Sequence, residues 1–108
     1  MEENQISPEE YVQRVLAAYR ATSGTTGTIR RPDRLLATQL HQRGVPLMAI
    51  ENAFVLAAAR RLIRPAEAPP LGTIRSLAYF VPVIEEVLNL RVNPDYFRHL
   101  RQKIEQTR

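Results

Sequence analysis

Arginine is the residue type in this sequence whose number and spacing suggest a chemical role. Of the 15 basic residues, only Lys103 is a lysine. A guanidinium group is planar and can donate two parallel hydrogen bonds to a phosphate. The basic residues gather in three places, so we take them as candidate contacts to nucleic acid. The candidates are Arg30, Arg31, Arg34, Arg60, Arg61, Arg64, Arg98, Arg101 and Lys103.

The charge is distributed unevenly along the chain. Four of the 11 acidic residues lie in the first ten positions, which contain no base, so the remainder carries a balance of +8. This balance favours an acidic partner such as nucleic acid. Two explanations that involve no partner account equally well for the number and positions of the arginines. The codons of a GC-rich genome favour arginine over lysine, and Arg60, Arg61 and Arg64 are favoured by the dipole at a helix C-terminus alone.

A second candidate for phosphate chemistry is the string Thr22-Ser23-Gly24-Thr25-Thr26-Gly27. It resembles the phosphate-binding loop of adenylate-forming enzymes, in which small residues let backbone N–H groups approach a phosphate. The chain continues Thr28-Ile29-Arg30-Arg31 where that family has a Pro-Lys-Gly run. Because such loops function between a strand and a helix, we interpret the likeness as a coincidence and residues 23–31 as a flexible loop.

Residues typical of catalysis and metal binding are sparse. There is no cysteine, and the two histidines, His41 and His99, have no carboxylate at ligand spacing. Glu85 and Glu86 are adjacent and point in different directions on a helix, unlike a pair of carboxylates that converge on a substrate. We therefore expect no enzyme, no metal, no cofactor and no small-molecule substrate.

The sequence also indicates where the protein resides. Its first residues, Met1-Glu2-Glu3-Asn4-Gln5, lack the basic and then apolar pattern of a signal peptide. The longest apolar stretch, residues 53–59, is too short to cross a bilayer. We predict a cytoplasmic protein without a membrane partner.

Helix start signals position the candidate residues. Ser7-Pro8, Pro32-Asp33 and Asn93-Pro94 each place a capping residue or a proline at a helix N-terminus. The first helix is expected to end near Thr22, the second at Gly44, and the third to run from Pro46 to about Arg64. Residues 73–90 are expected to form one element, broken or kinked at Pro82.

The predicted fold is all-α, a compact bundle of five or six helices around a central apolar helix. Residues 1–108 form a single domain, in which residues 1–6 are a flexible acidic N-terminus and residues 65–72 a proline-rich connector. The third helix is apolar on nearly every side, so it lies either in the core or against another chain.

The spacing of Leu40, Gly44, Val45 and Ile50 matches a helix-turn-helix. The second helix of such a motif presents polar side chains to the major groove. Here that helix begins Pro46-Leu47-Met48-Ala49, and its first half has only two polar residues. We therefore expect a helical hairpin used for packing rather than a motif that reads bases.

The middle of the chain resembles the C-terminal domain of DnaD-like replication-initiation proteins. The likeness rests on residues 44–53 and on Ile74-Arg75-Ser76-Leu77-Ala78-Tyr79, which precede a Tyr-x-x-x-Ile-x-x-x-Trp signature in that family. Val83 and Val87 stand at the signature's Ile and Trp positions, and Pro82 lies between Tyr79 and Val83. The resemblance implies a helical accessory module that binds DNA or replication proteins. It adds Arg91 to the candidate contacts, beside Arg98, Arg101 and Lys103.

These observations predict a non-catalytic helical binding module that contacts nucleic acid through its arginine clusters, in replication or in mobile-DNA functions. The alternative is a protein–protein interaction module, or a homodimer that buries part of the third helix, without nucleic-acid binding. The position of the three clusters discriminates between them, since phosphate contacts require arginines that share a face.

Overall fold

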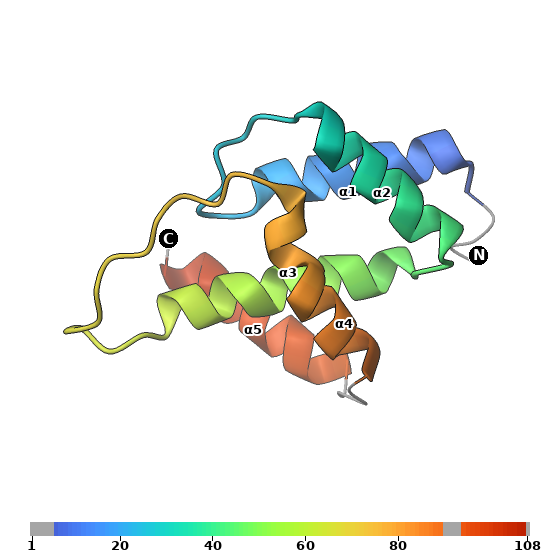
Figure 1. Cartoon of the computed structure of the whole chain (residues 1–108). Coiled ribbons are helices and arrows are strands. Elements are labelled where there is room, and N and C mark those ends of the chain that lie inside the picture. Colours follow the sequence, from blue (N-terminus) through green and yellow to red (C-terminus); the bar gives the residue numbers. More distant parts are fainter. Residues whose placement is uncertain (1–5, 90–93, 108) are drawn as a thin grey trace.

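The computed structural model describes the backbone of residues 6–89 and 94–107 and confirms the all-α fold. Within these residues it contains five α-helices, one short 3-10 helix and no strand (Figure 1). The predicted flexible N-terminus, residues 1–6, lies outside the described residues except for Ile6, and Arg91 also lies outside them. The elements in chain order are α1 (Pro8–Ala21), α2 (Arg31–Gln42), α3 (Leu47–Leu62), η2 (Leu77–Phe80), α4 (Val81–Asn89) and α5 (Pro94–Thr107).

The start signals at Ser7-Pro8 and Pro32-Asp33 are confirmed, and α5 begins at Pro94 as predicted, whereas Asn93 lies outside the described residues. Ser7 precedes α1, and its hydroxyl accepts a hydrogen bond of 3.0 Å from the Glu10 backbone N–H. This bond satisfies one of the donors that the first turn of a helix leaves free. Pro32 lies in the first turn of α2 and Pro94 begins α5, where the missing N–H of proline costs no hydrogen bond.

Two predicted boundaries are wrong. The third helix ends at Leu62, before Arg64. The element predicted from residue 73 begins at Leu77, since residues 73–76 are not helical and Ile74 forms an isolated bridge with Thr25. The 3-10 helix η2 then leads directly into α4, whose second residue is Pro82. Proline is tolerated there because the first turn of a helix needs no N–H donor at that position.

Helix α3 is central, as predicted, and it packs against α1, α4 and α5 of the same chain. The structure therefore favours the core interpretation of its apolar sequence over the interpretation that it faces another chain. Its buried residues are Leu47, Ile50, Ala53, Phe54, Leu56, Ala57, Ala58 and Ala59.

The turn between α2 and α3 is sharp because Gly44 adopts a positive φ of 76°. The expected packing hairpin is wrong in one respect, since α2 lies against α1 and η2 rather than along α3. Tyr11 of α1 holds the turn in place, because its buried hydroxyl donates a hydrogen bond of 2.7 Å to the Val45 carbonyl. At the start of α3, Leu47 and Ile50 are buried, and the most exposed side chain is the apolar Met48, which cannot read bases by hydrogen bonds.

Aromatic rings fill the centre of the core. Phe80 lies edge-on to Tyr19, Phe54 and Tyr79, with ring centroids 6.0, 4.8 and 5.1 Å away. Such edge-to-face contacts are favourable beyond the apolar area that they bury. Burial raises the pKa of Tyr19, and the nearby Asp33 carboxylate raises it further. The contacts of Phe80 with Tyr19 and Phe54 hold η2 against α1 and α3.

Candidate nucleic-acid interface

A buried aspartate joins the start of α2 to the start of η2. Asp33 is only 2% exposed. One carboxylate oxygen accepts a 2.9 Å hydrogen bond from the Arg30 N–H, and the other accepts one of 2.9 Å from the Leu77 N–H, which lies 44 residues away in sequence. The carboxylate is thus directed into the protein, where it fixes the two segments relative to each other.

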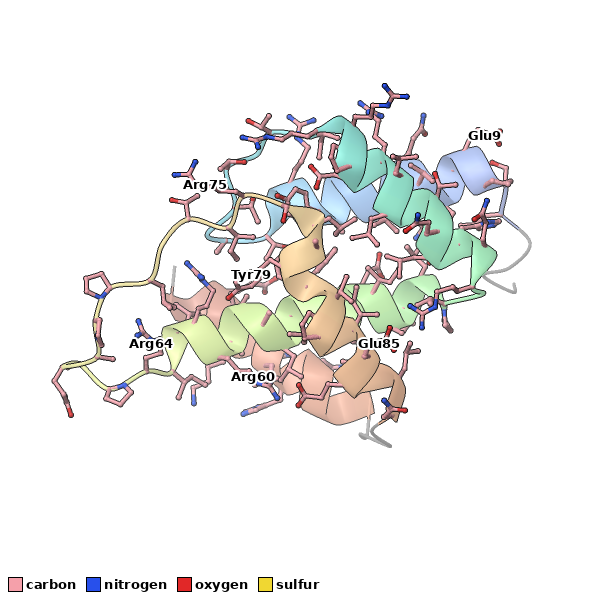
Figure 2. The ribbon with its side chains drawn as sticks, viewed as in Figure 1. Glu9, Arg60, Arg64, Arg75, Tyr79 and Glu85 are labelled. Atoms are coloured by element: carbon pink, nitrogen blue, oxygen red, sulfur yellow. The ribbon has the colours of Figure 1, made fainter. Side chains whose placement is uncertain are left out.

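Four exposed arginines lie within three residues of Asp33 or Leu77 along the chain. Arg30, Arg31 and Arg34 lie at the start of α2, and Arg75 lies two residues before Leu77. We call these four residues the α2-start surface. Figure 2 shows Arg75 and Arg64 at the end of the molecule opposite Glu9, so the acidic start of α1 and this basic end are far apart. Arg75 is not among the contacts predicted from the sequence, because its neighbours are set by a contact between distant segments.

The loop between α1 and α2 has a structural role. The Ile74 N–H donates to the Gly24 carbonyl at 2.7 Å, and the Thr26 N–H donates to the Ile74 carbonyl at 3.0 Å. The Thr25 N–H donates to the Thr22 carbonyl. These backbone donors are engaged within the protein, and a helix rather than a strand precedes the loop. Both findings support the interpretation of its phosphate-loop likeness as a coincidence.

The arginines at the end of α3 differ in their partners. Arg60 forms a salt bridge with Glu86 of α4, and the Arg60 guanidinium lowers the pKa of Glu86 below its usual value. Arg61 donates to the Gly72 carbonyl at 2.8 Å and to the Tyr79 hydroxyl at 3.3 Å. Arg64 donates to the Pro69 carbonyl at 2.6 Å. Arg60 is therefore neutralised, whereas Arg61 and Arg64 have neutral partners that leave their positive charge in place.

A second salt bridge, unforeseen from the sequence, joins Arg43 to Glu85. The two terminal guanidinium nitrogens of Arg43 donate to the Glu85 carboxylate, at 2.8 and 3.3 Å, which lowers the pKa of that carboxyl group. Glu85 and Glu86 thus bind arginines from different segments. The expectation that these adjacent glutamates point in different directions is confirmed.

The third basic cluster lies apart from the others. Arg98, Arg101 and Lys103 are exposed on α5, which packs on α3. Helix α2 packs on α1, and Figure 1 shows α3 between α2 and α5. The three predicted clusters therefore do not share one face, so the prediction that they contact nucleic acid together loses most of its support, and only a single cluster can carry such contacts. The hydrogen bond from the Leu77 N–H to Asp33 brings the segment that contains Arg75 to the start of α2, whereas the α5 cluster is separate.

The residues considered for other chemistry do not assemble. No group of three or more His, Asp or Glu side chains that could hold a metal occurs in the described part of the chain. His41 lies edge-on to Tyr11, with ring centroids 4.9 Å apart, as part of the packing between α1 and α2. Among the described helices, none has the length and apolarity needed to cross a membrane.

The chain was compared with known protein families, curated proteins and solved structures. The sequence matches no protein-family model, no curated protein and no solved structure. The function is therefore inferred from the basic surfaces of the chain itself.

Proposed function

We propose that this chain is a non-catalytic module that binds nucleic acid through phosphate contacts at the α2-start surface. One observation carries the proposal. Four exposed arginines gather around a junction whose carboxylate, Asp33, is buried and engaged with two backbone donors. Even with the full charge of Asp33 counted, the surface retains a surplus of three positive charges.

The geometry of the surface suits a nucleic-acid backbone. Arg31 and Arg34 are three residues apart, so they are neighbours on one face of α2. Arg75 reaches the same junction from another segment, which widens the basic area beyond one helix. Contacts of this kind position a backbone and are insensitive to base sequence. We therefore expect general binding with a steep dependence on salt.

The resemblance to DnaD-like replication-initiation proteins suggests a different location for the contacts, on α5. A role in replication or mobile DNA is part of the same proposal. Arg98, Arg101 and Lys103 form a cluster with the same number of charges as Arg31, Arg34 and Arg75. This equality allows a controlled comparison between the two surfaces.

The experiment measures binding of the protein to fluorescent duplex and single-stranded DNA by anisotropy at low salt. One variant carries Arg31→Gln, Arg34→Gln and Arg75→Gln. The matched control carries Arg98→Gln, Arg101→Gln and Lys103→Gln, so both lose three positive charges. Circular dichroism verifies that both variants keep the helical fold.

The proposal predicts that the α2-start variant loses most of its affinity, by a factor of about ten or more, since charge-assisted contacts each contribute on the order of 1.5 kcal/mol or more. The α5 control should lose much less. If the control loses affinity and the α2-start variant does not, the contacts lie on α5. If the wild-type protein binds neither DNA at low salt, the proposed function is wrong.

A protein–protein role is the second candidate, and it has an observation of its own. Leu62, Ile63 and Leu71 lie at the end of α3 and in the connector, and they are 47%, 61% and 45% exposed. Exposed apolar side chains that lie together are typical of interaction surfaces. A homodimer through this area should appear in light scattering at micromolar concentration, and Ile63→Asp should dissociate it. A monomer at that concentration argues against the dimer.

A further inference from the structure

A hollow lies where the connector passes over the end of α3. Its volume is about 400 Å³, within the range of pockets that hold small ligands. Its lining includes Arg60, Arg61, Arg64, Leu71, Tyr79 and Val83. A neighbouring hollow of about 310 Å³ shares Arg61, Arg64 and Leu71 with it, so the two arginines stand between two open spaces.

The charge of the hollow is positive. The salt bridge with Glu86 neutralises Arg60. Arg61 and Arg64 donate to two carbonyl groups and a phenol, which orient the guanidinium groups without cancelling their charge. The C-terminus of α3 opposes them with a dipole equivalent to about half a negative charge. The net result is a site with more than one positive charge, suited to a dianion.

Tyr79 supplies an aromatic wall that is held in position. Its ring packs edge-on against the buried Phe80 at 5.1 Å, and its hydroxyl accepts a hydrogen bond from Arg61. The Arg61 guanidinium also lies 6.0 Å from the ring centroid. Despite these contacts Tyr79 remains 45% exposed, so an aromatic ligand can reach it. Tyr79 and Arg64 both line the hollow, and Figure 2 shows Arg64 at the end of α3 and Tyr79 beside the start of α4.

From this arrangement we infer that the hollow binds the phosphate monoester of a nucleotide, with Arg61 and Arg64 on the phosphate and Tyr79 against the base. A monoester carries up to two negative charges at neutral pH, whereas a phosphate within a nucleic-acid chain carries one. The hollow therefore favours a chain end or a free mononucleotide over the middle of a strand. Stacking of a base on an exposed aromatic ring is tolerant of sequence.

The inference rests on the proposed function only if the monoester is the end of a nucleic acid. Two sources offer the same chemistry, a 5′-phosphorylated strand and a free nucleoside monophosphate. The test therefore compares short single strands of one sequence with a 5′-phosphate or a 5′-hydroxyl. Adenosine 5′-monophosphate and inorganic phosphate serve as competitors.

Three variants test the named residues. Arg64→Gln removes the arginine that contacts the connector. Arg14→Gln is its control, because it removes the same charge from an exposed position on α1 that does not line the hollow. Tyr79→Leu removes the ring and keeps an apolar side chain. Arg61→Lys keeps the charge but loses the planar fork, and it avoids complete loss of a residue that supports the loop at Gly24.

The wild-type protein should prefer the 5′-phosphorylated strand by about tenfold or more, as expected for charge-assisted hydrogen bonds to a phosphate. Arg64→Gln and Arg61→Lys should abolish most of this preference, and Arg14→Gln should retain it. Tyr79→Leu should weaken binding of adenosine 5′-monophosphate by about tenfold and leave inhibition by inorganic phosphate unchanged.

The remaining outcomes separate this inference from the proposed function. Equal binding of both strands, with no binding of adenosine 5′-monophosphate that depends on Arg64, overturns the inference and leaves the proposed function standing. Binding of the mononucleotide alone, lost in Arg64→Gln, supports the inference with a free nucleotide as ligand and contradicts the proposed function. Equal competition by inorganic phosphate and the mononucleotide, or a preference that survives both arginine variants, overturns the assignment of a nucleotide to this hollow.

Discussion

Substitution of Asp33 by alanine should destabilise the protein by more than is usual for a single substitution of a polar residue. The change leaves two backbone N–H groups without their acceptor, on Arg30 and on Leu77. The Leu77 bond is buried, so its loss costs about 1–3 kcal/mol, whereas the partly buried Arg30 N–H can turn to water at a cost of about 1 kcal/mol. The sum, about 3 kcal/mol, is a large fraction of the roughly 5–15 kcal/mol that typically stabilises a domain.

The assay is urea unfolding followed by circular dichroism, supported by thermal unfolding. A loss of about 3 kcal/mol corresponds to a fall in Tm on the order of 15 °C for a domain of this size. Asp33→Asn keeps one acceptor oxygen and should lie between the wild type and Asp33→Ala. Glu67→Gln, on the exposed connector, is the control and should change little. A loss below about 1 kcal/mol for Asp33→Ala would refute the role of this carboxylate as the link between α2 and η2.

Three further predictions concern stability. Tyr11→Phe should lower the free energy of unfolding by about 1–2 kcal/mol, because a buried carbonyl loses its donor. Tyr19→Phe should cost under about 1 kcal/mol, because the Thr26 side chain near the buried Tyr19 hydroxyl lies outside hydrogen-bonding geometry. Equal losses in urea titrations would contradict this difference. Gly24→Ala should destabilise by more than about 1 kcal/mol, since its φ is 93° and a Cβ would lie 3.1 Å from a guanidinium nitrogen; an unchanged Tm would contradict the strain. The lowered pKa values of Glu85 and Glu86 stabilise the fold at pH values above the ordinary glutamate pKa, and this contribution is lost as the pH falls through the lowered values. Replacing both residues with Gln should therefore reduce the dependence of the free energy of unfolding on pH, and only in the acid range.

Much of the fold could be predicted because its signals are local. Ser7 and Pro8 specify the start of α1 through bonds within one turn, and Gly44 forms the turn after α2 through its own backbone conformation. The all-round apolar sequence of α3 correctly indicated a central helix. The boundary at Leu77 was missed because the extended segment before it is held by Ile74 pairing with the distant loop at Gly24 and Thr26.

The candidate site was less predictable, because it depends on contacts between distant segments. Nothing near Asp33 in the sequence indicates that its carboxylate accepts the Leu77 N–H, and this bond is what brings Arg75 to the start of α2. The neutralisation of Arg60 by Glu86 likewise depends on how α4 packs against α3. Sequence spacing identified clusters of charge, but only the packing of helices shows which charges remain available.

The salt dependence of DNA binding tests the central claim most directly. Each phosphate that the protein neutralises on duplex DNA contributes about −0.9 to the slope of log K against log salt concentration. The wild-type protein should show a slope of about −3 or steeper, and the variant without Arg31, Arg34 and Arg75 should have a slope shallower by about 3. A wild-type slope near zero, or an unchanged slope in the variant, would contradict phosphate binding at the α2-start surface.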